Sequence, residues 1–256
     1  MYKPALEVGR RFVETHQPAG RVLLCAVTGS HHYGFASADS DLDLKGIYLA
    51  PTSQILGLDD PEETRDRMQW SEGVECDLTL HEARKALRLL LGGNGNMLER
   101  ILSPYQLFET PELAELRALL PSCLSRRFQR HYAGYFRGQV NEHVKSATPR
   151  AKTLLYSYRV ALTGTHLMRT GELLVDLNQS AVEYGFTGIV PAIELKRAGG
   201  EKAELPADLD LELRREWPRL EEMVAGSVSA SPLPESPAGQ SGLCNLLQRM
   251  RMDNMG

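Results

Sequence analysis

The chain of 256 residues is poor in cysteine, and its cysteines are not spaced as metal ligands or disulfide partners usually are. The four cysteines, Cys25, Cys76, Cys123 and Cys244, are scattered without a C-x-x-C pair. Structural zinc sites and disulfide frameworks need cysteines at patterned spacings, so this scatter argues against both. Cys25 and Cys76 fall at apolar strand positions, which predicts core thiols rather than nucleophiles. A reducing, cytoplasmic location fits this cysteine usage best.

Long apolar runs and a surplus of positive charge are also missing. No run approaches the roughly 20 apolar residues of a membrane-spanning helix, and residues 1–20 lack the layout of a signal peptide. With 29 Lys and Arg against 33 Asp and Glu, the net charge is −4. Such a chain has no overall field that concentrates nucleic acid. We expect a soluble protein without a membrane partner, which handles any polyanion at a local site.

The apolar fraction of 42% is ample for a packed interior, and the length favours more than one part. We predict an α/β domain over residues 1–109 and a mainly helical domain over 110–225. The segment 227–243 is rich in Ser, Pro, Ala and Gly, and LCNLLQRMRM follows. Residues 226–256 are therefore predicted to form a flexible linker and a short C-terminal helix that could dock.

Short apolar and alternating segments in the first part indicate strands, followed by a helix. The expected elements are a helix near 3–16, strands over 21–28, 41–50 and 74–80, and a helix over 81–91. The acidic, irregular segment between residues 51 and 73 predicts a solvated loop rather than a core element. From about 111 to 170 the pattern is helical, with breaks near Pro121 and around 147–149, and further helices are expected up to 225.

One arrangement of residues in the sequence has the features of a metal-binding catalytic site. A buried strand leads into Gly29-Ser30, a polar loop follows, and Asp41 and Asp43 lie two residues apart on the next strand. Because strand side chains alternate, both carboxylates face the same side and can bind Mg²⁺ together. A third carboxylate, from Asp77 or alternatively from Glu75 on the same face, would complete a site for two metal ions.

The run GSHHYGFASADSDLDLKGIYLAP, residues 29–51, resembles the G-S-x-x-Y-G and S-D-x-D-x-x-G pattern of DNA polymerase beta-like nucleotidyltransferases. It is most similar to the predicted family of an RNA repair pathway. DLTLHEARKALRLLLGGNGNMLE, AKTLLYSYRVAL and ELKRAG extend the resemblance, which spans roughly residues 22–199. It implies an α/β fold, in which a small mixed sheet with flanking helices precedes a mainly helical domain that closes over the nucleotide. The active site is expected between them.

The resemblance also implies roles for individual residues. Asp41, Asp43 and Asp77 are implied as metal ligands and catalytic residues, and Gly29 and Ser30 as triphosphate contacts. Where the pattern often has a basic residue, this chain has His31 and His32, whose charge depends on pH. The nucleotide-binding residues implied around the motif are Gly29, Ser30, His31 and Ser40.

A helix beyond the first domain supplies the remaining candidates. In the superfamily such a helix commonly presents a lysine to the phosphates, and Lys152 fits this role. Tyr156 and Arg159 follow at spacings of four and three, on the same helical face. The alternative is that all three form the solvated face of an amphipathic helix.

The expected function is transfer of a nucleoside monophosphate from an NTP, such as ATP, to an acceptor hydroxyl, with release of pyrophosphate. Two Mg²⁺ ions are expected, with Mn²⁺ as a substitute. An RNA end is the favoured acceptor, and a protein or small molecule remains an alternative. The other readings are a regulatory module that binds nucleotide without turnover and a nucleotidyltransferase antitoxin that acts on a partner protein. The sequence does not determine the oligomeric state.

Overall fold

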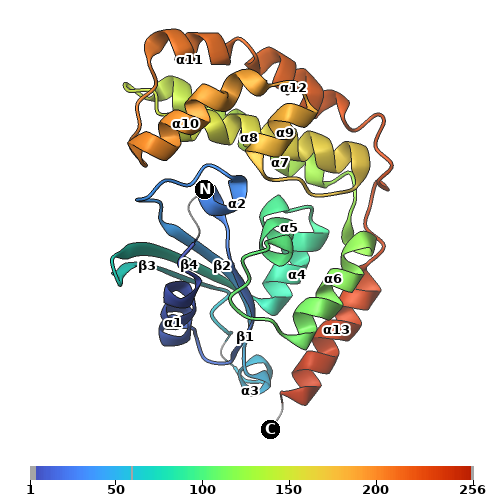
Figure 1. Cartoon of the computed structure of the whole chain (residues 1–256). Helices are drawn as coiled ribbons and strands as arrows, with labels where there is room; N and C mark the ends of the chain where they lie inside the picture. Colours follow the sequence, from blue (N-terminus) through green and yellow to red (C-terminus); the bar gives the residue numbers. More distant parts are fainter. Residues whose placement is uncertain (1–3, 59, 255–256) are drawn as a thin grey trace. The chain divides into compact units, whose positions relative to one another are not determined.

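The computed structural model describes residues 4–58 and 60–254. Its described residues group into two compact units (Figure 1). Unit 1 comprises Ser30–Ser40 and Ser125–Glu235, and unit 2 comprises Pro4–Gly29, Asp41–Leu124 and the chain from Ser236 onward. The predicted domain boundaries at 109/110 and 225/226 stay predictions. The short segment 30–40 belongs to the helical unit although the sheet flanks it on both sides in sequence.

Unit 2 is built on a mixed four-stranded sheet in the order β1-β2-β4-β3. Its strands are β1 (Arg21–Val27), β2 (Leu42–Leu49), β3 (Thr64–Ser71) and β4 (Val74–Glu82). β2 runs parallel to β4, whereas β1 and β3 pair antiparallel with their neighbours. The predicted small mixed sheet is confirmed. β2 and β4 occupy its centre, which is where the candidate carboxylates lie.

The prediction of a loop between residues 51 and 73 is wrong in part. This segment contains helix α3 (Thr52–Leu56) and the whole of β3, which pairs with β4 from Thr64↔His81 to Ser71↔Val74. β3 is an edge strand, and its sequence TRDRMQWS is mostly polar. A strand that buries neither face needs no apolar alternation, so this segment carries no strand pattern. The hairpin turn uses Glu72 and Gly73 at positive φ.

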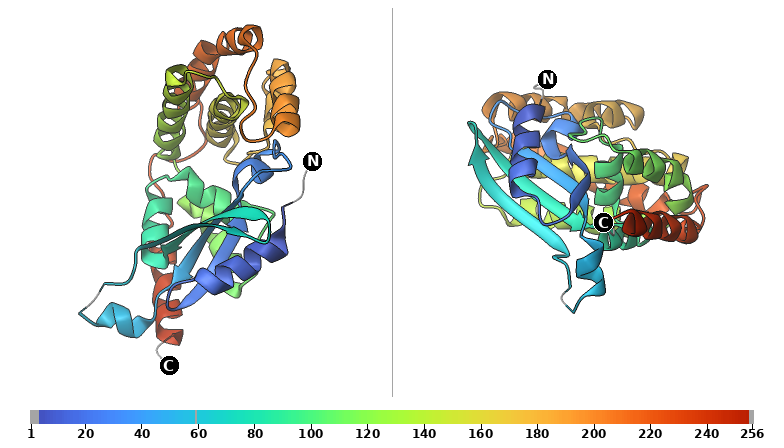
Figure 2. Two further views of the ribbon diagram at one scale, coloured as in Figure 1. Left: turned by 90° about the vertical axis from the view of Figure 1, so that its left-hand side faces the viewer. Right: turned by 90° about the horizontal axis from the view of Figure 1, so that it is seen from below.

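One face of the sheet packs against helix α1 (Leu6–His16), as Figure 2 shows. Phe12 and Val13 of α1 belong to one apolar cluster with the alternate residues of the central strands. Cys25 and Cys76 are fully buried in this cluster, and burial raises their pKa values to about 12 and about 11. A thiol with such a pKa stays protonated at neutral pH, so both are core thiols as predicted.

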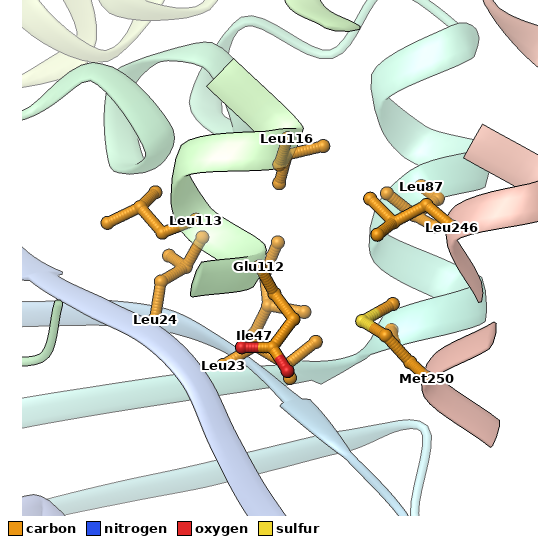
Figure 3. Close-up of a pocket in the computed structure, with 10 residues that line it drawn as sticks. Leu23, Leu24, Ile47, Leu87, Glu112, Leu113, Leu116, Leu246 and Met250 are labelled. Carbon is orange, nitrogen blue, oxygen red and sulfur yellow. The ribbon is translucent and has the colours of Figure 1, made fainter. Parts of the chain in front are cut away.

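On the opposite side, α4 (Ala83–Leu91) contacts β2 and β4, and α5 (Gly95–Leu102) and α6 (Pro111–Cys123) contact β1. Helix α13 (Gln240–Asp253) packs on α4 and α6. Figure 3 shows Leu87, Leu116, Leu246 and Met250 from three of these helices around Ile47 of β2. The space between them, about 10 Å³, holds no more than one water molecule. The C-terminal helix thus packs on α4 and α6, while the predicted division of residues 226–256 into a linker and a helix stays a prediction.

Unit 1 is helical, as expected for this part of the chain. Its helices are α7 (Phe128–Lys145), α8 (Ala151–Thr170), α9 (Leu177–Glu183), the 3-10 helix η1 (Thr187–Ile189), α10 (Val190–Gly199), α11 (Ala207–Arg214) and α12 (Trp217–Gly226). Helix α2 (Gly29–Tyr33) begins at the last residue of unit 2. The Arg126 guanidinium donates to the carbonyls of Ser231 and Leu233, which fixes part of the predicted linker. In the described ranges, no helix is long and apolar enough to cross a membrane.

Candidate active site

Asp43 and Asp77 lie side by side across the two central strands. They are register partners in the parallel β2–β4 ladder, so their carboxylates project from the same face of the sheet. Both side chains are partly exposed, at 20% and 29%. Asp41 lies just before β2, and its Oδ1 is buried with no hydrogen-bond partner among residues 4–58 and 60–254. Unit 2 therefore holds all three predicted carboxylates: Asp43 and Asp77 are direct neighbours, and Asp41 lies two residues before Asp43.

A lysine that the sequence reasoning missed joins this group. Lys45 Nζ lies 2.7 Å from Asp77 Oδ2 and 3.9 Å from Asp43 Oδ1, and it also donates to Thr79 Oγ1. The ammonium group offsets the repulsion between two carboxylates on adjacent strands. Its position two residues after Asp43, in the run DLDLK, was the available signal. That spacing puts Lys45 on the same strand face.

The strand register bears on the choice between Asp77 and Glu75 as the third carboxylate. Asp77 is aligned with Asp43 on β2, whereas Glu75 is aligned with Trp70 on the outer strand β3. Both acids share one face of β4, as expected from their spacing of two. The choice of Asp77 as the third carboxylate stays a prediction.

The donor chemistry around Asp43 fits a divalent cation. Within the part of the chain that the structure describes, no three His, Cys, Asp or Glu side chains converge closely enough to hold a metal ion. Two carboxylates nevertheless reach one cationic group, Lys45 Nζ, and Asp41 contributes a buried oxygen that is unbonded within the described ranges. Carboxylate oxygens are the hard ligands that Mg²⁺ prefers.

Gly29 is the other predicted residue that lies directly at the carboxylates. Its φ of +63° is in the left-handed region, and a Cβ built on it would lie 1.7 Å from Asp43 Oδ2. The preceding Thr28 amide donates to the Asp43 carbonyl at 2.8 Å. The chain thus passes so close to Asp43 that only glycine fits.

The remaining candidates of the motif belong to unit 1. Ser30, His31 and Ser40 are all buried. The Ser40 hydroxyl donates to Glu201 Oε1 at 2.8 Å and lies 3.0 Å from the Ser37 hydroxyl. In this structure, Ser40 therefore ties the segment 30–40 to the residues that follow α10.

The three residues predicted on one face of α8 have different surroundings. Lys152 Nζ forms an ion pair with Glu201 Oε2 at 2.6 Å. The Tyr156 ring meets the Tyr33 ring edge-on at 5.6 Å. The Arg159 guanidinium lies 3.8 Å above the Tyr33 ring, and the residue is fully buried. The alternative of a solvated helix face is wrong for Arg159, because α8 is packed within unit 1.

Lys196 is a second lysine that the sequence reasoning did not single out, although it lies in the ELKRAG motif. It is fully buried and donates to Ser37 Oγ and Glu201 Oε1, both at 2.7 Å. Burial raises the pKa of Glu201, but hydrogen bonds from Lys152 and Lys196 outweigh burial, and the net pKa is lowered. Glu201 is therefore held as a carboxylate between two ammonium groups.

The mixed sheet carries aligned acids on its central strands, and a glycine turn lies against one of them. These are the features expected of a DNA polymerase beta-like nucleotidyltransferase. A sequence model of the RNA repair pathway DNA polymerase beta family matches residues 6–227. The match covers most of the chain, so the protein belongs to this family. The resemblance read from residues 29–51 is confirmed.

Two uncharacterized proteins are similar to this chain, at 24% and 25% sequence identity. The uncharacterized protein YcgL of Bacillus subtilis is 24% identical over 200 residues, which cover 75% of each chain. The uncharacterized protein MJ0002 of Methanocaldococcus jannaschii is 25% identical over 160 residues. That match covers 61% of this chain and only 64% of the relative's length.

A nucleotidyltransferase-like protein from Exiguobacterium sibiricum is similar in structure, with a TM-score of 0.36 and 12% identity. The similarity covers 89% of this chain and 77% of the other. A likeness of this degree adds nothing to the assignment, which rests on the family match.

Proposed function

We propose that this protein transfers a nucleoside monophosphate from an NTP, ATP among them, to an acceptor hydroxyl and releases pyrophosphate. The alignment of Asp43 with Asp77 on the parallel strands β2 and β4 carries the proposal. It puts two carboxylates on one face, at the point where Gly29 lets the backbone approach closely. Phosphoryl transfer needs positioning and charge neutralisation more than covalent chemistry from the protein, and this arrangement offers both.

Asp41, Asp43 and Asp77 would hold two Mg²⁺ ions, with Mn²⁺ as a substitute. When bound, these ions would neutralise the triphosphate and favour the deprotonated form of the attacking hydroxyl. Lys45 keeps the Asp43 and Asp77 carboxylates directed to a common point through its contacts at 3.9 and 2.7 Å. We assign to Gly29 the role of leaving space beside Asp43.

The nucleotide contacts in unit 1 form the second part of the proposal. Ser30, His31 and Ser40 are assigned to the triphosphate, and Lys152 supplies positive charge. Tyr156 is assigned to the base or ribose. Because Arg159 is fully buried against Tyr33, it would act by fixing the rings rather than by touching a phosphate.

The acceptor and the cellular location are also part of the proposal. The family's description points to RNA repair, so an RNA end is the acceptor we favour. The four cysteines are free thiols in the structure, and free thiols are typical of the cytoplasm.

The test is to incubate the protein with each α-labelled NTP, Mg²⁺ and RNA and protein acceptors, and to follow the label. Asp41→Ala and Asp43→Ala are expected to reduce transfer by more than about 100-fold. Asp208→Ala, at an exposed position in α11, is the matched control and should retain activity. Comparing Asp77→Asn with Glu75→Gln identifies the third carboxylate.

Full turnover by both folded alanine variants would refute the mechanism. Mg²⁺-dependent NTP binding without pyrophosphate release would instead identify a regulatory module. Label found on a co-purifying protein would identify an antitoxin-like activity.

A further inference from the structure

The edge strand β3 carries two large apolar side chains that are exposed to solvent and do not pack in the core. Met68 and Trp70 are each 66% exposed, in a strand whose other residues are polar. Exposed tryptophan is uncommon, because its ring gains more from burial than most side chains do. Two such residues at a spacing of two lie on the same strand face and form a small apolar surface. We call Met68 and Trp70 the β3 platform.

The strand register puts the β3 platform on the face of the candidate active site. Met68 is the partner of Asp77, and Asp77 is the partner of Asp43, so the three residues form one row across β3, β4 and β2. Trp70 is the partner of Glu75, one step along the same face. At ~4.8 Å between neighbouring strands, Met68 is about 10 Å from Asp43.

The opposite face of β3 carries polar side chains, as expected of an edge strand. Arg65 and Arg67 lie on that face with Gln69, and the Arg65 side chain donates to the His16 carbonyl of α1 at 3.4 Å. The apolar cluster on this face of the sheet does not include Met68 or Trp70. The apolar residues of β3 thus lie on the carboxylate side and not on the side that packs against α1.

We propose that the β3 platform stacks the terminal base of a single-stranded nucleic-acid acceptor, so that the acceptor's hydroxyl is presented to Asp43 and Asp77. The proposal rests on the function proposed above and names its acceptor class. A flat indole and a thioether stack on any base, because every base has an aromatic face. A separation of about 10 Å leaves room for a sugar between the stacked base and the acids.

The position of β3 favours the acceptor over the NTP as the occupant. β3 is an edge strand of the sheet, as Figure 1 shows, so a polymer bound there can continue past the sheet edge. An exposed edge strand can also pair with a second copy, so a dimer is one outcome of the test.

The experiment measures binding of a fluorescein-labelled single-stranded RNA oligonucleotide by anisotropy, without NTP, using the full chain. Trp70→Ala should weaken binding by about 5- to 150-fold, which corresponds to the loss of one stacked base. Trp70→Phe should retain most of the affinity. Leu56→Ala removes another exposed apolar side chain, 75% exposed in α3, and should leave binding unchanged.

Three results would overturn the proposal. The first is an oligonucleotide affinity that is unchanged in Trp70→Ala. The second is a Trp70→Ala variant that loses ATP affinity, measured by calorimetry, but keeps its oligonucleotide affinity. The third is a wild-type dimer in sedimentation that Trp70→Ala dissociates.

Asp43→Ala separates this proposal from the catalytic one, because it should bind the oligonucleotide normally while losing nucleotidyl transfer. Oligonucleotide binding that depends on Trp70, together with full transfer by Asp43→Ala, would leave the platform standing and refute the mechanism.

Discussion

Gly29 is subject to two constraints at once. Its backbone is at φ +63°, and the Cβ position is taken by the Asp43 carboxylate. Positive φ alone costs a non-glycine residue about 1 kcal/mol. Overlap with a carboxylate oxygen costs more, because either the turn or the Asp43 side chain must move. The residue therefore controls the position of a candidate metal ligand.

We predict that Gly29→Ala abolishes nucleotidyl transfer and lowers the melting temperature. Gly73→Ala is the matched control, since Gly73 also has positive φ but its Cβ position has no described atom within 4 Å. It should lose about 1 kcal/mol of stability and keep its activity. Equal activities in the two variants would show that the approach of Gly29 to Asp43 is not needed.

Helix α13 is attached to the sheet by a nearly buried ion pair. Arg251 pairs with Glu82, at 13% and 3% side-chain exposure, and also donates to the Ala50 carbonyl at 2.7 Å. Glu82 in turn accepts from the Arg84 amide at the start of α4. One arginine thus connects the C-terminal helix with the residue after β2 and with Glu82 of β4, which also caps the start of α4. Arg249 on the same helix pairs with Glu115, where both side chains are about half exposed.

Arg251→Ala is predicted to lower the free energy of unfolding by about 3–5 kcal/mol, because it leaves Glu82 buried without its partner. Arg249→Ala should cost no more than about 1 kcal/mol, since exposed ion pairs contribute little. Urea denaturation followed by circular dichroism measures both. Similar losses in the two variants would contradict the assignment of Arg251 as the attachment point.

At the scale of the whole molecule, the chain passes twice between its two units around the candidate site. It leaves unit 2 after Gly29, contributes residues 30–40 to unit 1, and returns to unit 2 at Asp41. Within unit 1 this segment is held by Lys196, which donates to Ser37, and by Arg197 and Asn178, whose side chains donate to the Gly34 carbonyl. The excursion places a segment of unit 1 directly before the first candidate metal ligand in sequence.

We predict that Lys196→Met raises the amide hydrogen-exchange rates of residues 34–40 by roughly tenfold or more, equivalent to ~1.4 kcal/mol of lost local stability. The rates of β2 should stay unchanged, because β2 belongs to unit 2. Lys202→Met, at an exposed position, is the control. Mass spectrometry of deuterated peptides reports each segment, and unchanged protection of 34–40 would disprove the role of Lys196.

Local patterns in the sequence were enough to predict the central strands, the helical part and the family. Alternation and turn residues act over a few positions, so β2, β4 and the Asp41, Asp43 and Gly29 motif could all be read directly. β3 could not, because an exposed edge strand of polar residues has the composition of a loop. Its strand character comes from hydrogen bonds to β4 alone.

The sequence by itself determined the family, the carboxylate motif and the apolar pattern of the core. Only the tertiary structure decided which residues surround those carboxylates. Lys45 meets Asp77 across 32 residues of sequence, and Met68 aligns with Asp77 through the β3–β4 register. The parallel β2–β4 register joins segments that are distant in sequence, so no short turn fixes it. The β3–β4 register follows from a tight turn, but it could not be used because β3 has no strand pattern. The burial of Arg159 and Lys196 likewise follows from packing between helices that are distant in sequence.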